Sequence, residues 1–108
     1  MNVIVFGANG QLGRSLKENI NKNNFLKKKY KWIWISRQNC DFQNIFKIKK
    51  IIKTFKPKIV INAAAFTNVD GAELKKYHAY KINALAPKVI AEEANKLGYQ
   101  VTHLLIDG

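Results

Sequence analysis

The sequence has 108 residues, 47% of them hydrophobic, and carries 19 Lys and Arg against 7 Asp and Glu, a formal net charge of +12. This length fits one domain, residues 1–108, with a core of its own, and it is small for a complete two-domain enzyme. No stretch approaches the roughly 20 continuous apolar residues of a membrane span, and the N-terminus lacks a secretory pattern. We therefore expect a cytoplasmic protein with no membrane contact.

The positive charge raises nucleic acid as a possible partner. However, only Arg14 and Arg37 are arginines, whereas nucleic-acid readers usually use arginine forks as well as lysines. The lysine clusters "KNNFLKKK" and "KIKKIIKTFK" fall on surface loops and on the outer face of a predicted helix, so we expect a solvated surface and no nucleic-acid partner. Cys40 is the single cysteine, which excludes an internal disulfide, and it has no metal-ligand spacing, so no metal site is expected.

Strand and helix patterns alternate along the chain. Strands are predicted at residues 2–6, 31–35, 58–62 and 100–106, and helices at 10–23, 45–56 and 70–97, the last broken near Ala86-Pro87. Pro57 and Gly98 stop the second and third helices, and "KNNFLKKK" is predicted to be a surface loop. Long crossovers demand parallel pairing. The expected fold is a Rossmann-type, doubly wound α/β sheet of four strands, in the spatial order second, first, third, fourth.

Three glycines follow the first strand in the stretch "VIVFGANGQLGRSL". Gly7 permits a tight turn, Gly10 lets a pyrophosphate approach the backbone, and Gly13 allows close helix packing. The amides of Gln11 and Leu12 at the helix N-terminus would hold the phosphate charge. Glycines also serve ordinary turns, but the placement between strand and helix is the context that a dinucleotide site requires. The stretch therefore predicts a dinucleotide cofactor.

The end of the second strand is expected to meet the adenosine ribose of that cofactor. An acidic residue there is typical of NAD sites, whereas an arginine accommodates the 2′-phosphate of NADP. The sequence has Ser36 and Arg37 and no acid, which favours NADP(H) over NAD(H), with a merely solvated Arg37 as the alternative. Asp41 and Phe42 follow, where they could contact adenine or instead cap a loop and pack in the core.

One protein family shares local sequence patterns with four stretches of the chain: "GANGQLG", "CDFQN", "KPKIVINAAAFTNVDGAE" and "INALAPKVIAEEA". Together they resemble dTDP-4-dehydrorhamnose reductase, an extended short-chain dehydrogenase/reductase, and the match covers the whole chain. The resemblance implies NADPH-dependent reduction of the C4 keto group of dTDP-4-dehydro-L-rhamnose.

The resemblance also implies roles for matching residues. Gly10, Gln11 and Leu12 fall where the family binds pyrophosphate, and Asp41 and Phe42 where it contacts adenine. The chain passes the nicotinamide-side ribose at Ala63, Ala64, Ala65, Phe66 and Thr67. Asn83 matches an asparagine of the catalytic tetrad, although a polar helix residue could equally bond locally.

The last residues depart from the family. Its active-site threonine corresponds to Ile106, which has no hydroxyl, and only Asp107 remains of the substrate-contacting pair. The family's catalytic Tyr-x-x-x-Lys pair is absent after the last strand. Tyr77 and Lys81 have that spacing but precede Asn83 on the predicted helix, so they are expected to be a surface pair.

His78 and His103 match no catalytic position. An apolar last strand without a further neighbour also favours a truncated form, inactive alone, that keeps its cofactor-binding parts. The dTDP-sugar would bind only if the missing half is supplied. The alternative is a non-enzymatic nucleotide-binding or regulatory module that pairs its last strand with a partner chain or with a second copy.

Overall fold

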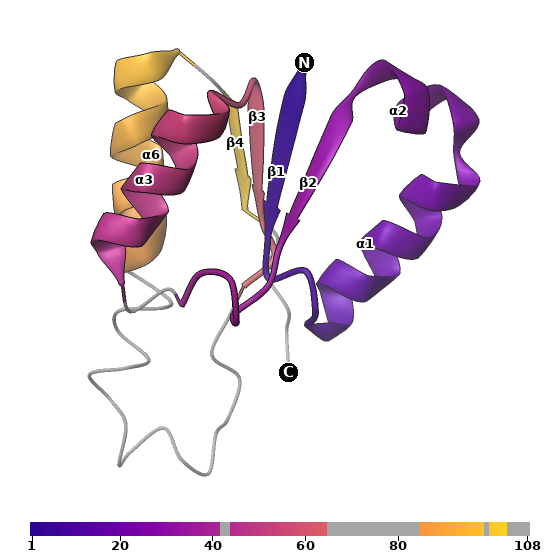
Figure 1. Cartoon of the computed structure of the whole chain (residues 1–108), viewed down its shortest axis with the longest axis horizontal. Coiled ribbons are helices and arrows are strands. Elements are labelled where there is room, and N and C mark those ends of the chain that lie inside the picture. Colours follow the sequence, from indigo (N-terminus) through magenta and orange to yellow (C-terminus); the bar gives the residue numbers. More distant parts are fainter. Residues whose placement is uncertain (42–43, 65–84, 99, 104–108) are drawn as a thin grey trace, which may run out of the picture.

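The computed structural model describes residues 1–41, 44–64, 85–98 and 100–103, which form a parallel sheet between two helical layers (Figure 1). The strands are β1 (Asn2–Phe6), β2 (Lys31–Ile35), β3 (Ile59–Asn62) and β4 (Gln100–His103). The helices are α1 (Gln11–Lys22), α2 (Asn24–Lys29), α3 (Ile45–Phe55) and α6 (Ala86–Leu97). The prediction of a Rossmann-type α/β fold with parallel strands is confirmed.

The described strands lie in the order β2-β1-β3-β4, with β1 and β3 inside and β2 and β4 at the edges. The register pairs Phe6 of β1 with Ile35 of β2 on one side and with Asn62 of β3 on the other. Consequently three strands end at one level beside the loop that leaves β1. This edge of the sheet is where a parallel α/β fold binds its ligands.

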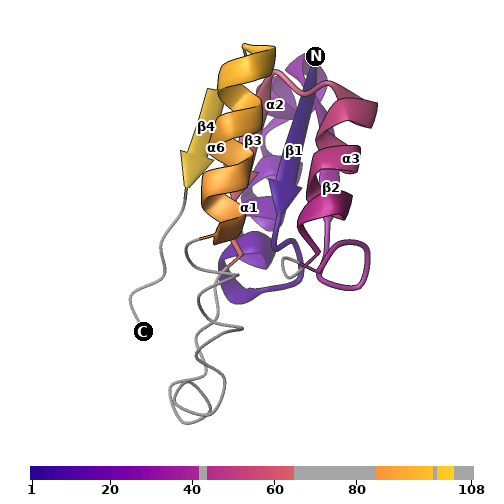
Figure 2. The same ribbon diagram turned by 90° about the vertical axis from the view of Figure 1, so that its left-hand side faces the viewer.

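One face of the sheet carries the main hydrophobic core. Helices α3 and α6 lie side by side over this face, and α1 and α2 lie on the opposite side (Figure 2). Apolar side chains at helical spacing on α3 and α6 pack against alternate residues of the strands, as the amphipathic pattern predicts. The fully buried members include Ile4, Phe6, Ile48, Ile52, Val60 and Ile90.

The opposite face combines a buried centre with an aromatic edge. Val3 and Val5 of β1 are fully buried there. On β2, Trp32 and Trp34 stack with 5.7 Å between ring centroids, and the ammonium group of Lys17 from α1 lies 5.7 Å from the Trp34 ring centroid. Helix α1 is therefore held over the β2 side of this face.

The structure corrects one predicted element. The segment "KNNFLKKK" contains the six-residue helix α2 instead of being a loop throughout. The Asn23 side chain caps this helix by accepting a hydrogen bond from the Leu26 amide at 3.0 Å, and the Trp32 indole N–H donates to the Leu26 carbonyl at 3.0 Å. These contacts stabilise a helix that is too short and too charged to be predicted locally.

The bounds of β1 and β2 are as predicted, and those of α1, α3 and β3 differ from the predictions by at most one residue at each end. Helix α3 ends at Phe55, one residue before the predicted end. Lys56 is its C-cap in the left-handed conformation (φ 44°), and Pro57 follows. Helix α6 begins at Ala86 with Pro87 in its first turn, and Gly98 is its C-cap. The predicted helical stretch over residues 70–84 and the end of the last strand, residues 104–106, lie outside the described residues.

Candidate functional site

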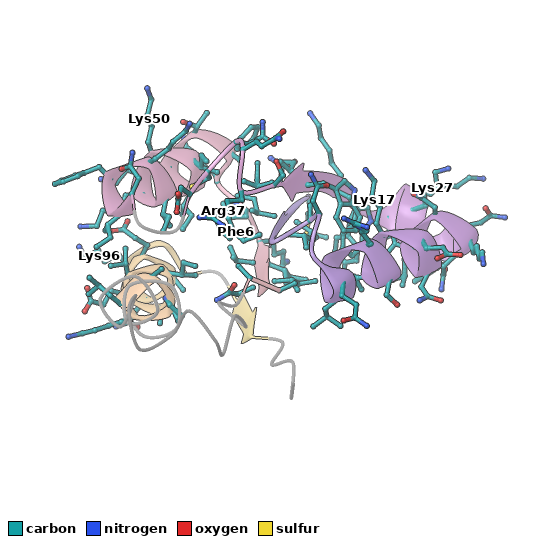
Figure 3. All side chains as sticks on the ribbon, turned by 90° about the horizontal axis from the view of Figure 1, so that it is seen from below. Phe6, Lys17, Lys27, Arg37, Lys50 and Lys96 are labelled. Carbon is teal, nitrogen blue, oxygen red and sulfur yellow. The ribbon has the colours of Figure 1, made fainter. Side chains whose placement is uncertain are left out.

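The loop between β1 and α1 occupies the middle of the sheet's carboxyl edge, which Figure 3 shows from below. The Gly10 amide donates to the Gly7 carbonyl at 3.1 Å, which closes a tight turn directly after β1. The Arg14 amide then donates to the Gly10 carbonyl at 2.9 Å and begins the hydrogen-bond ladder of α1. The chain thus passes from a buried strand to a helix within four residues.

Gly7 and Gly13 carry no side chain because the protein's own backbone occupies the space that a Cβ would need. Gly7 has φ +79°, and a Cβ there would lie 2.6 Å from both the carbonyl carbon of Ala63 and the amide nitrogen of Ala64. A Cβ on Gly13 would overlap the carbonyl oxygen of Gly7 and lie 2.9 Å from the backbone of Ala8. The fold alone therefore requires glycine at both positions.

Gly10 differs from these two glycines. The nearest atom to a Cβ built there is the carbonyl oxygen of Gly7 at 3.5 Å, an ordinary contact, so no described atom of the protein requires glycine. Among the described residues, no other atom beyond its chain neighbours lies within 4 Å of this Cβ. A backbone left bare beside open space is what a bound group needs for close approach.

The N-terminus of α1 also lacks the cap that two other helices have. Asn23 caps α2 and Asn44 caps α3, each with a side-chain oxygen that accepts a backbone amide, whereas Gly10 supplies none and the first turn of α1 holds no acid. Within the described residues, nothing accepts from the amides of Gln11 and Leu12. Free amides at the positive end of a helix dipole suit an anion. The loop therefore fits a diphosphate.

The end of β2 is tied to this loop. The Ala8 amide donates to the Ile35 carbonyl at 3.1 Å, so the loop that leaves β1 lies beside the segment that follows β2. There Ser36 is buried and its hydroxyl donates to the Asn39 side chain at 2.8 Å. The Asn39 amide completes the turn by donating to the Ser36 carbonyl at 3.1 Å. Sequence reasoning missed Asn39, whose role depends on this turn.

Arg37 and Asp41 lie on the solvent side of the same turn. The Arg37 guanidinium is 74% exposed and lies 3.9 Å from the Asp41 carboxylate, which is 42% exposed. An exposed ion pair at this distance contributes little to stability. The pair therefore leaves the Arg37 cation accessible beside the glycine loop.

The end of β3 completes the edge. The Ala63 amide donates to the Phe6 carbonyl at 2.9 Å, and the side chain of buried Asn62 accepts from the Ala64 amide at 3.0 Å. These bonds hold the small residues Ala63 and Ala64 against Gly7. The structure thus brings the first alanines of "NAAAFT" to the loop, as the fold prediction expected.

The structure unites three groups of predicted site residues at one edge: the glycine loop, Ser36 to Asp41, and Ala63 and Ala64. The remaining predicted residues lie outside the described residues: Phe42, Ala65, Phe66, Thr67, Tyr77, His78, Lys81, Asn83, Ile106 and Asp107. Their roles stay predictions.

Cys40 lies just behind this edge, in the core. Burial raises the pKa of its thiol, and the neighbouring cation of Lys47 opposes that shift. A protonated, buried thiol suits packing and not nucleophilic chemistry. Within the described residues no group of three or more His, Cys, Asp and Glu could hold a metal ion, and no helix there is long and apolar enough to cross a membrane.

Several curated relatives of the chain are dTDP-4-dehydrorhamnose reductases. The dTDP-4-dehydrorhamnose reductase of Aggregatibacter actinomycetemcomitans is 35% identical over 97% of this chain and 34% of its own length. That of Escherichia coli K12 is 34% identical over 99% of this chain and 35% of its own length. The chain thus spans about a third of the length of the curated relatives it matches.

Solved structures agree with the fold and with the family. A dTDP-4-dehydrorhamnose reductase of Bacillus anthracis, in complex with NADP, has a TM-score of 0.80 and 33% identity over 93% of this chain and 34% of that one. A Clostridium acetobutylicum dTDP-4-dehydrorhamnose reductase has a TM-score of 0.81 and 37% identity over 94% of this chain and 34% of that one. The family model described as "RmlD substrate binding domain" matches residues 1–107. The resemblance predicted from the sequence is therefore confirmed, and the chain belongs to the RmlD substrate binding domain family, together with these dTDP-4-dehydrorhamnose reductases.

Proposed function

We propose that this chain binds NADP(H) at the carboxyl edge of its sheet and forms the cofactor-binding part of a dTDP-4-dehydrorhamnose reductase. The observation that carries the proposal is the uncapped N-terminus of α1 beside the open space at Gly10. The NADP in the Bacillus anthracis relative supports the choice of cofactor. NAD(H) is the alternative cofactor.

In this proposal the amides of Gln11 and Leu12 bind the diphosphate. The turn at Ser36 and Arg37 faces the adenosine ribose, Asp41 and Phe42 the adenine, and residues 63–67 the nicotinamide-side ribose. When bound, NADPH would supply the hydride for the C4 keto group of dTDP-4-dehydro-L-rhamnose. Asn83 is proposed to help organise the proton relay and Asp107 to contact substrate.

We also propose that the chain alone does not reduce this sugar. It spans about a third of the length of its relatives, and Ile106 offers no hydroxyl at the position of the family's threonine. A cytoplasmic location is also part of the proposal.

Titration of the purified chain with NADPH and NADH in a calorimeter tests the cofactor proposal. We expect saturable binding of NADPH. No saturable heat with either nucleotide at about 1 mM, the upper end of ordinary KM values, would refute it. Turnover of dTDP-4-dehydro-L-rhamnose by the chain with NADPH would refute the proposed inactivity and leave the binding proposal standing.

A second candidate, a nucleotide-binding module that pairs with another chain, is favoured by the β4 side of the sheet. β4 is an edge strand of the described sheet, and next to it Ile59 and Ile61 of β3 are only half-buried, whereas Val60 is fully buried on the other face. We propose that this side binds the remainder of a reductase or a second copy. Light scattering after gel filtration tests self-association, and a strictly monomeric species at high concentration would exclude it.

A further inference from the structure

The chain has two arginines, one on α1 next to the glycine loop and one in the turn after β2. The other Lys and Arg positions are all lysines, and those labelled in Figure 3, Lys17, Lys27, Lys50 and Lys96, lie on the helices. Arg37 follows β2 and was expected beside a ribose, whereas Arg14 on α1 was given no role by the sequence. Its side chain nevertheless makes a specific contact at the site.

The Arg14 side chain folds back over the loop instead of extending from α1 into solvent. Its Nε–H donates to the carbonyl oxygen of Asn9 at 2.7 Å, across five residues of sequence. The guanidinium has five N–H donors, so this bond leaves others for a ligand. Arg14 is exposed, and no carboxylate of the described residues forms an ion pair with it. Its charge is uncompensated.

The bond to Asn9 holds the Arg14 side chain against the glycine loop. Asn9 directly follows Ala8, whose amide is bonded to the Ile35 carbonyl. Arg37 is two residues beyond Ile35. The loop that Arg14 contacts is thus tied through its backbone to the end of β2, the strand that Arg37 follows.

Arg37 alone does not supply enough positive charge to balance a 2′-phosphate at this site. A phosphate monoester carries between one and two negative charges near neutral pH. Arg37 shares its charge with Asp41 at 3.9 Å. A second cation without an acidic partner would supply the missing charge, and a guanidinium offers paired donors that fit phosphate oxygens.

We propose that Arg14 binds the 2′-phosphate of NADP(H) together with Arg37 and is a specificity-determining residue for NADP(H) over NAD(H). This inference rests on the proposed cofactor function. The diphosphate remains with the amides of Gln11 and Leu12, which both nucleotides share. Arg14 thus acts on the one group that distinguishes them.

The test measures NADPH and NADH affinities of the wild type and of Arg14→Gln by calorimetry. The loss of a charged hydrogen bond predicts a roughly tenfold weaker NADPH affinity and less than about a twofold change for NADH. Lys22→Gln is the matched control, because it removes the same charge from the exposed far end of α1 and is expected to change neither affinity. Arg14→Lys, which keeps the charge without the fork, is expected to lose less than Arg14→Gln.

Competition by 2′,5′-ADP and 5′-ADP provides a second readout. Arg14→Gln is expected to weaken the binding of 2′,5′-ADP and to leave the binding of 5′-ADP unchanged. Thermal unfolding of each variant verifies that the fold is kept. Equal losses for NADPH and NADH would assign Arg14 to the diphosphate or to loop geometry and overturn the inference, as would no loss at all. If the wild type binds neither nucleotide, the proposed function itself fails, whereas nucleotide binding without selectivity refutes only the role of Arg14.

Discussion

Substitution of Gly10 and Gly13 by alanine separates a glycine kept for a ligand from one kept for the fold. In Gly13→Ala, the new Cβ meets the backbone of Gly7 and Ala8, which cannot rotate away as a side chain could. Alanine within a helix gains about 1 kcal/mol over glycine. Overpacking of a rigid site costs about 1–3 kcal/mol, and direct overlap with backbone lies at the upper end or beyond. We therefore expect a net loss of about 2 kcal/mol.

Gly10→Ala is expected to leave stability nearly unchanged. Its Cβ meets only the Gly7 carbonyl oxygen at 3.5 Å, and its φ of −74° is open to any residue. Alanine at an N-cap costs up to about 1 kcal/mol relative to glycine. The reduced freedom of the unfolded chain offsets about 0.4–1 kcal/mol of this cost. The net change in the free energy of unfolding is therefore within about 0.5 kcal/mol.

Nucleotide affinity is expected to respond differently. The Cβ of Gly10→Ala fills the space in front of the Gln11 and Leu12 amides, and we expect at least about a tenfold loss for NADPH and NADH alike, which is 1.4 kcal/mol. Urea unfolding followed by the fluorescence of Trp32 and Trp34 gives stability, and calorimetry gives affinity. Unchanged affinity in Gly10→Ala would refute the placement of the diphosphate, and destabilisation equal to that of Gly13→Ala would show that the fold itself requires Gly10.

Three other predictions concern residues around the same edge. Asn44→Ala removes the cap of α3, in which the side chain accepts the Lys47 amide at 3.1 Å, and is expected to lower the free energy of unfolding by about 1 kcal/mol in urea titrations. Asp41→Asn removes the acid that shares the Arg37 charge, so the ratio of NADPH to NADH affinity in calorimetry is expected to rise; a fall would place Asp41 elsewhere. Burial raises the pKa of Cys40, so its thiol is expected to react with a disulfide reagent at about pH 8 more slowly than free cysteine, and urea is expected to abolish the difference.

The order of strands and helices could be predicted because each element carries its own periodicity. The branched residues of "NVIVF" are buried, as are Ile48 and Ile52 of α3, in agreement with their spacing, and Gly98 ends α6. Helix α2 could not be predicted, because its stability depends on the bond from the Trp32 indole to the Leu26 carbonyl, made by a strand that follows it in sequence. A local pattern contains no such contact.

The site could be predicted in outline and not in its contacts. The spacing of glycines located the loop, but only coordinates show that Gly7 is bare because Ala63 and Ala64 approach it from β3. For the same reason Arg14 was indistinguishable in the sequence from an ordinary exposed basic residue. Its bond to the Asn9 carbonyl arises from the way the loop folds back on α1.

We expect nucleotide binding at the carboxyl edge to be separable from contacts made on the β4 side of the sheet. The loop, its amides and the turn after β2 are held by β1, whose residues Val3 to Phe6 are fully buried, and by bonds such as that from Ala8 to Ile35. Ile59 and Ile61 of β3 pair with Val3 and Val5 of β1, and they remain half-buried beside β4. Covering those two isoleucines with another polypeptide would stabilise the sheet by burying apolar surface, without altering the free amides at Gln11 and Leu12. A complementing segment is therefore expected to raise the melting temperature while leaving NADPH affinity nearly unchanged, and a large gain in affinity on complementation would contradict this separation.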